Sequence, residues 1–162
     1  MLNKRELIEQ LYAHLRDAQG VARRAEAAAS EEARDGASAS EKRESARVAL
    51  ENQSLAKGQA QRAERTQAEL VALSRFQAPA VVRGKVELGA IVEVEDGGEG
   101  RTFFLAPVGA GVELAGPGGD GFLSVVTPAS PVGRAVLGRS VGESVEVVVR
   151  GEPREWTITW IE

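Results

Sequence analysis

The 162-residue sequence contains no cysteine, and this absence excludes disulfide bonds, thiolate metal sites and cysteine nucleophiles. It also lacks any apolar run near the roughly 20 residues that a membrane span needs, and its N-terminus lacks the apolar core of a signal peptide. We therefore expect a cytoplasmic protein without a membrane partner. The single histidine, His14, lies between Leu11 and Leu15 in a helical pattern, so we expect no metal site or general base there.

A strong positive charge is also missing. The formal net charge is −4, so we expect little or no independent DNA binding, because nucleic-acid-binding domains are usually basic. The charge is unevenly distributed: residues 1–85 carry 15 Lys/Arg and 12 Asp/Glu, a balance of +3, whereas residues 86–162 carry 5 and 12, a balance of −7. The two parts of the chain therefore differ in electrostatic character.

Helix-breaking residues are almost absent from the first half of the chain. Only three of the 18 glycines precede residue 84, and the first of the six prolines is Pro79. Since glycine and proline are the residues that most disfavour helix interiors, this division predicts two domains. We place them at residues 1–75 and 86–162, with a linker over 76–85.

Residues 1–75 carry two heptad patterns. Apolar and small residues recur at alternating spacings of three and four, which is the stripe that two packed helices need. In each stripe the large residues lie far from residues 36–41 and the small residues lie nearer to them. We therefore expect an antiparallel coiled-coil hairpin with its tip near 36–41. The first stripe consists of Ile8, Leu11, Leu15, Ala18, Ala22, Ala25 and Ala29, and the second of Ala49, Asn52, Ala56, Gln59, Ala63, Thr66, Leu70 and Leu73.

Residues 86–162 show the short alternating runs and turn residues of a small β-sheet domain. Ser130 is expected to cap one short helix, with Pro131 in its first turn and Gly138 closing it. Residues 150–153 are expected to connect the last two strands. The overall prediction is an α+β fold. The expected strands are 89–95, 101–105, 112–114, 122–126, 145–149 and 156–161.

The run Ser-Pro-x-Gly-x-Ala-x-Leu-Gly at 130–138, followed by Val-Gly-Glu at 141–143 and two closing strands, resembles a known domain. It is similar to the C-terminal FKBP-like domain of the bacterial Gre transcript-cleavage factors. The resemblance implies a non-enzymatic transcription elongation factor without a cofactor of its own. It also implies a monomer that docks at the rim of the RNA polymerase secondary channel and inserts its coiled coil there.

Within that resemblance, Ser130, Pro131, Val132 and Gly133 are the candidate polymerase-binding residues. An alternative reading gives them only local roles as a helix cap, a helix start and a core contact. Gly133 and Gly138 are expected to serve the backbone geometry rather than a function, and Leu137 is expected to belong to the core. An FKBP-like fold does not imply prolyl isomerase activity, because function resides in sites rather than folds. The aromatic residues Phe103, Phe104, Phe122, Trp156 and Trp160 are expected in the core and on strand faces.

The hairpin tip is where the resemblance weakens. Gre factors share a Gly-Asp-x-x-Glu-Asn-x-Glu/Asp-Tyr run there, whose first two acids help to hold a magnesium ion in the polymerase active site. Here Glu41 matches the glutamate and Glu44 the later acid, while Ser38 takes the place of the aspartate and Lys42 that of the asparagine. Asp35 substitutes for the missing acid only if the loop shifts. A transient magnesium ion at Glu41 is thus conceivable only inside the polymerase.

Two readings of function follow. In the first, the chain binds RNA polymerase and either stimulates transcript cleavage or blocks or reshapes the channel without supplying metal. In that reading Glu41 and Glu44 act in the channel; otherwise they are solvated acids that meet the positive end of a helix dipole. In the second, the chain is a structural or adaptor protein that self-associates through the helical hairpin.

Overall fold

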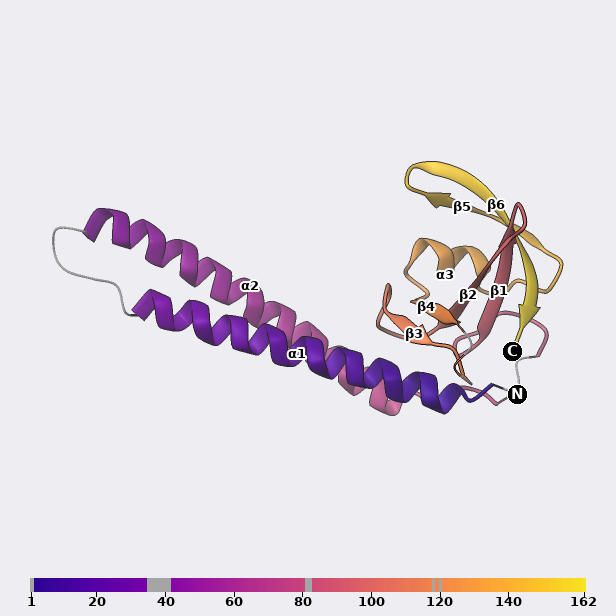
Figure 1. Cartoon of the computed structure of the whole chain (residues 1–162), viewed down its shortest axis with the longest axis horizontal. Coiled ribbons are helices and arrows are strands. Elements are labelled where there is room, and N and C mark those ends of the chain that lie inside the picture. The colour runs from indigo at the N-terminus through magenta and orange to yellow at the C-terminus, as the bar shows by residue number, and fades with distance from the viewer. Residues whose placement is uncertain (1, 35–41, 81–82, 118, 120) are drawn as a thin grey trace. The chain divides into compact units, whose positions relative to one another are not determined.

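The computed structural model describes residues 2–34, 42–80, 83–117, 119 and 121–162. Figure 1 shows two long helices, which are followed along the chain by a sheet and one short helix, so the predicted α+β class is confirmed. None of the described helices contains an apolar stretch that could cross a membrane. The elements are α1 (Lys4–Arg34), α2 (Lys42–Arg75), β1 (Ile91–Asp96), β2 (Glu99–Leu105), β3 (Glu113–Ala115), β4 (Phe122–Val126), α3 (Pro131–Val136), β5 (Ser144–Val149) and β6 (Glu152–Ile161).

The chain forms two compact units. The first, here called the hairpin unit, is Ala13–Val71. The second, here called the sheet unit, combines Met1–Tyr12 with Ala72–Glu162. The sheet unit therefore contains the first turns of α1 and the last turn of α2 as well as every strand.

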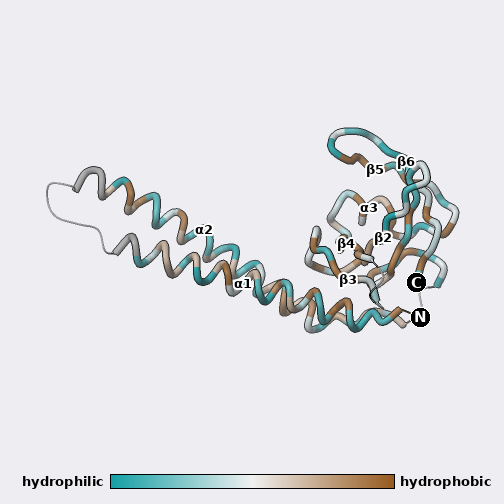
Figure 2. Tube along the Cα trace, in the orientation of Figure 1, coloured by the Kyte–Doolittle hydropathy of each residue, from teal (hydrophilic) through white to brown (hydrophobic). Residues whose placement is uncertain are grey.

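The hairpin unit consists of the long middle parts of α1 and α2. Both helices are free of proline and contain one glycine each, Gly20 and Gly58, which explains their length. They run antiparallel, as Figure 1 shows, and Gln19 of α1 donates a hydrogen bond from its amide nitrogen to the side-chain oxygen of Gln67 in α2. Figure 2 shows hydrophobic residues recurring along both helices between hydrophilic ones, as a packed stripe requires.

The buried stripe follows the predicted heptads only in part. Ala18 is exposed rather than buried, and Leu7, outside the predicted stripe, is fully buried. The predicted stripe residues that are only half-buried are Ile8, Ala25, Ala49, Asn52 and Gln59. A single partner helix covers only a narrow strip, so a small side chain at the edge of that strip stays in solvent. The buried stripe residues of the hairpin unit are Leu15, Ala22, Ala29, Ala56, Ala63, Thr66 and Leu70.

Within the described part of the chain, the sheet has six strands in the order β3-β4-β2-β1-β6-β5. β1 and β2 form the predicted antiparallel hairpin, and β2 pairs with β4 in parallel. β6 pairs antiparallel with β1 on one side and with β5 on the other, with a shift of register between Glu93 and Val94. The six strands expected from sequence are thus all present in one sheet.

The connection between β5 and β6 is shorter than expected. Only Arg150 and Gly151 form the turn, with φ values of 53° and 83°, as in two-residue hairpin turns. Glu152 and Pro153, expected in the loop, belong to β6, where Pro153 lies opposite Val148. Proline is tolerated there because this end of β6 pairs with β5 alone, which leaves the other side without a ladder to join.

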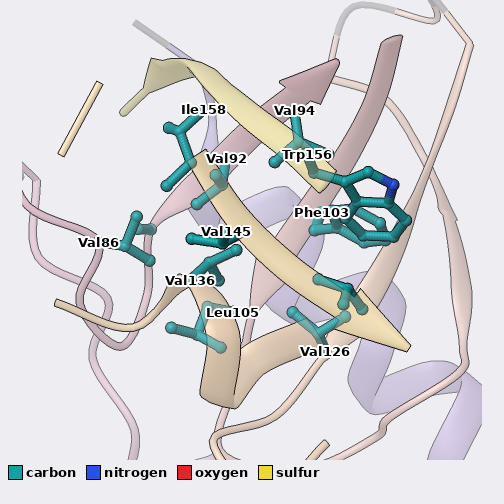
Figure 3. Close-up of a cluster of buried hydrophobic side chains, with 12 residues drawn as sticks. Val86, Val92, Val94, Phe103, Leu105, Val126, Val136, Val145, Trp156 and Ile158 are labelled. Atoms are coloured by element: carbon teal, nitrogen blue, oxygen red, sulfur yellow. The ribbon is translucent and has the colours of Figure 1, made fainter. Parts of the chain in front are cut away.

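The core of the sheet unit lies between one face of the sheet and α3, as Figure 3 shows. Trp156 is the largest fully buried side chain and stacks on Phe103 with ring centroids 5.7 Å apart. Phe104 is also buried, so three of the five singled-out aromatic residues are in the interior as predicted. Phe122 and Trp160 lie on strands but are exposed.

The start of α1 packs within the sheet unit. Leu11 is fully buried, and Gly109 lies so close to it that an added Cβ would meet the Leu11 Cδ1 at 2.5 Å. The side chain of Gln10 donates to the Ala115 carbonyl at 3.2 Å and accepts from the Ala115 amide at 2.9 Å. The end of β3 is thereby attached to α1.

Candidate functional site

The segment 127–133 runs from the end of β4 into α3, and the side chain of Ser130 holds it together by hydrogen bonds. Ser130 is the N-cap residue of α3, with φ −71° and ψ 153°, and its Oγ accepts from the Gly133 amide at 3.1 Å and from the Thr127 amide at 3.2 Å. The same hydroxyl donates to the Thr127 carbonyl at 2.8 Å. Because every bonding capacity of this hydroxyl is used internally, Ser130 positions the segment.

Gly133 is equally structural. A Cβ at this position would lie 1.8 Å from the Thr127 carbonyl oxygen, a distance that real Cβ atoms do not reach. Glycine is therefore required by the close approach of α3 to the backbone of residue 127, as the sequence predicted.

Pro131 and Val132 have different surroundings. Val132 is half-buried and packs against the hydrophobic core, whereas Pro131 occupies the first turn of α3 and is exposed. Of the four candidate residues, Pro131 alone is exposed. Ser130, Val132 and Gly133 therefore have the local roles that the alternative reading gives them. Pro131 is accessible to a partner.

Two exposed apolar residues follow in the chain. Leu137 was expected in the core, but 43% of it is exposed, and Val141 is 55% exposed. The helix ends here, since Gly138 adopts φ 79° and donates its amide to the Val86 carbonyl at 2.8 Å, which turns Leu137 outward. Sequence reasoning missed both side chains because apolar residues near a short helix are usually buried.

The backbone around Val141 is held in place by its neighbours. The Gly142 amide donates to the Ile158 carbonyl at 2.8 Å, and the Arg139 carbonyl accepts from Val86 at 2.7 Å. Arg139 also forms an ion pair with Glu143 at 3.6 Å. Residues 130–143 are here called the docking segment, after the candidate polymerase-binding residues 130–133 that they include. Its exposed apolar side chains Pro131, Leu137 and Val141 are carried on a well-connected backbone.

Three ionisable groups elsewhere in the sheet unit have shifted pKa values. The hydrogen bond from Arg154 to Asp96, at 3.0 Å, lowers the pKa of that carboxyl group and raises the pKa of Arg154. Burial lowers the pKa of the Lys4 ammonium, against the charges of Glu162 and Glu87 that favour its protonated form. These groups are structural, since each interacts within the sheet unit.

The tip residues are placed only in part. Asp35 and Glu41 lie outside the described residues, as does the predicted tip at 36–41. Glu44 lies in the first turn of α2. His14 is an exposed residue of α1. Within the described ranges, no group of three or more His, Cys, Asp or Glu residues is arranged to hold a metal ion.

The family model described as "Transcription elongation factor, GreA/GreB, C-term" matches residues 81–162, just over half of the 162-residue chain. Among curated protein sequences, no match was found.

Among solved structures, the chain is similar to Gfh1 of Thermus aquaticus, with 22% sequence identity, coverage of 99% of this chain and 96% of that one, and a TM-score of 0.41. It is similar to GreA factor homolog 1 (Gfh1) of Thermus thermophilus, with 24% identity, coverage of 93% and 94%, and a TM-score of 0.39. A further similar structure is the transcription elongation factor GreA/GreB from Nitrosomonas europaea, with 18% identity, coverage of 59% and 78%, and a TM-score of 0.37.

Proposed function

This chain belongs to the GreA/GreB family of transcription elongation factors, and from that membership we propose that it binds RNA polymerase in the cytoplasm, docks by residues 86–162 and inserts the hairpin in the secondary channel. There it modulates elongation or the polymerase's own transcript cleavage, and it has no enzymatic activity of its own. The family match over residues 81–162 is the observation that carries this proposal.

The helices supply a probe of suitable dimensions. α1 has 31 residues and α2 has 34, so at a rise of 1.5 Å per residue each is about 45 to 50 Å long. The stripe between them is built largely from alanine, which allows two helices to approach closely. A narrow antiparallel pair of that length suits a channel.

The docking segment supplies the proposed contact with the polymerase. Pro131, Leu137 and Val141 are exposed apolar residues on a backbone held by hydrogen bonds, and covering them in an interface would remove apolar surface from water, which favours binding. Ser130 and Gly133 act through the backbone geometry that presents Pro131, and Val132 fixes the segment to the core.

Binding is tested with purified core polymerase. We expect the wild-type chain to be retained by immobilised polymerase, and the Leu137→Ser/Val141→Ser double variant to be retained about tenfold more weakly, because two apolar side chains no longer leave water on binding. Val148→Ser is the control, because Val148 is also exposed but lies on β5, outside the docking segment. No retention of the wild-type chain contradicts polymerase binding, and equal retention of all variants contradicts this docking segment.

The tip determines which effect the factor has. Ser38 and Lys42 depart from the family's acidic run, which favours obstruction of the channel over delivery of metal. Asp35, Glu41 and Glu44 remain the proposed tip acids, and any magnesium ion that they meet belongs to the polymerase.

A cleavage assay separates the two effects. Stalled elongation complexes are incubated with wild-type chain, with Glu41→Ala/Glu44→Ala, and with Glu64→Ala, an exposed acid of the hairpin unit that serves as the control. Stimulated cleavage that only the double variant loses requires a catalytic tip. Unchanged or reduced cleavage with all three proteins, together with slower elongation, supports obstruction.

Self-association through the hairpin is the alternative function. α2 exposes large apolar side chains, including Val48, Leu55 and Leu50, which is 66% exposed. Such residues on a helix surface can pair with a second copy of the chain. Sedimentation at several concentrations tests this: a stable homodimer that does not bind core polymerase favours the alternative, and a monomer that binds polymerase contradicts it.

A further inference from the structure

The sheet unit contains a pocket that is separate from the docking segment. Its volume is about 500 Å³, within the range of sites that hold small molecules or single side chains. No residue of the docking segment lines it. The lining residues are Leu2, Glu93, Thr102, Gly116, Pro117, Phe122, Leu123 and Trp160.

Glu93 is the one acid among the described residues that line the pocket. Glu93 in β1 lies opposite Thr102 of β2 on one side and opposite Trp160 of β6 on the other. Directly opposed residues in antiparallel strands have Cβ atoms about 5 Å apart, so these three side chains are neighbours. The Glu93 Oε1 lies 3.4 Å from the Thr159 hydroxyl, and among the described residues no cation pairs with Glu93.

Two of the residues that line the pocket, Phe122 and Trp160, are aromatic. Phe122 is 79% exposed and Trp160 is 37% exposed, in a chain with only seven aromatic residues. An aromatic face attracts a cation through its quadrupole, and the attraction is strongest for tryptophan. A pocket that combines exposed aromatic side chains with a carboxylate is therefore complementary to a positively charged group that also carries an apolar or flat surface.

The electrostatics of the surrounding sequence favour the same ligand. Residues 86–162 carry a formal charge of −7, and a cleft with an excess of one sign raises the local concentration of the opposite charge. A single carboxylate with aromatic neighbours is a poor site for a metal ion, which needs several oxygen ligands. A guanidinium group can stack on an indole while it donates hydrogen bonds to a carboxylate.

We propose that this pocket receives an arginine side chain that RNA polymerase presents to the sheet unit. The inference rests on the proposed polymerase binding and adds a second, electrostatic contact to the apolar one of the docking segment. Glu93 accepts the hydrogen bonds, Trp160 and Phe122 provide the aromatic faces, and Thr102 borders the site.

Two pairs of variants test the pocket, and the affinity of each variant for polymerase is measured. Glu93→Gln removes the charge with little change of shape and is expected to weaken binding about tenfold. Glu95→Gln, an exposed acid two residues along β1 that does not line the pocket, is its control and should stay within about twofold. Trp160→Leu should weaken binding more than Trp160→Phe, because phenylalanine keeps an aromatic face.

A titration with N-acetyl-arginine amide tests the pocket without polymerase. The two indole N–H signals of the ¹⁵N-labelled full chain are assigned with Trp160→Phe, and the ligand is expected to shift the Trp160 signal but not that of buried Trp156. Glu93→Gln should abolish the shift, and Glu95→Gln should retain it.

The outcomes separate the two proposals. If the wild-type chain binds polymerase but Glu93→Gln and Glu95→Gln bind equally well, the pocket inference is wrong while the proposed function stands. If the wild-type chain does not bind polymerase, the proposed function fails, and the polymerase-borne arginine fails with it. The titration then tests only whether the pocket binds an arginine side chain. An unshifted Trp160 signal contradicts that binding.

Discussion

Substitution of Gly133 by alanine is expected to destabilise the sheet unit strongly. The added Cβ would lie 1.8 Å from the Thr127 carbonyl oxygen and 3.0 Å from the Ser130 Oγ, so either α3 or the segment before it must move. Movement breaks the N-cap, which costs about 1 kcal/mol, and overpacking adds about 1 to 3 kcal/mol. We therefore expect the free energy of unfolding to fall by about 2 to 4 kcal/mol.

Urea denaturation followed by tryptophan fluorescence measures this change, because both tryptophans, Trp156 and Trp160, belong to the sheet unit. Gly100→Ala is the matched control. Its added Cβ would meet nothing closer than the Glu93 Oε1 at 3.9 Å, and its effect should stay within about 0.5 kcal/mol. If the two variants unfold at the same urea concentration with equal slopes, the steric argument for Gly133 is refuted.

Two further predictions concern the hairpin unit and the pH dependence of the sheet unit. Gly58→Ala should stabilise α2 by about 0.5 to 1 kcal/mol, since nothing lies within 4 Å of the added Cβ; unchanged melting by far-UV circular dichroism would contradict this. The pKa of Asp96 is lowered by its hydrogen bond from Arg154, so its contribution to stability is present above the unfolded pKa and lost as the pH falls through the folded one. Asp96→Asn should therefore lose less stability than wild type between about pH 5 and pH 2 in fluorescence-monitored urea titrations, and parallel pH profiles would contradict the assignment.

Local patterns were enough to predict most of the fold. The absence of proline before Pro79 and the heptad stripes predicted the two helices, and alternation with turn residues predicted the six strands. The cap at Ser130 and the need for glycine at 133 also followed from local sequence. These features depend on interactions between residues close in the chain, which a sequence displays directly.

Features that depend on distant residues were missed. The exposure of Leu137 follows from the hydrogen bond between Gly138 and Val86, and the membership of Pro153 in β6 follows from which strands flank it. The pocket around Glu93 joins residues of four strands whose register no local pattern reveals. The candidate site was therefore predictable as a segment, but not which of its side chains reach the surface.

Leu11 packs against Gly109, and Gln10 forms hydrogen bonds with Ala115. The sheet unit is therefore built from two segments that are far apart along the chain. Its opening residues are synthesised first, yet their contact sites emerge from the ribosome about a hundred residues later. Long loop closure of this kind slows assembly, so the hairpin unit has time to form before the sheet closes. A fragment that begins at residue 76 lacks the helical turns that cover Gly109 and Ala115, and one designed to fold should carry residues 1–12 on a short tether.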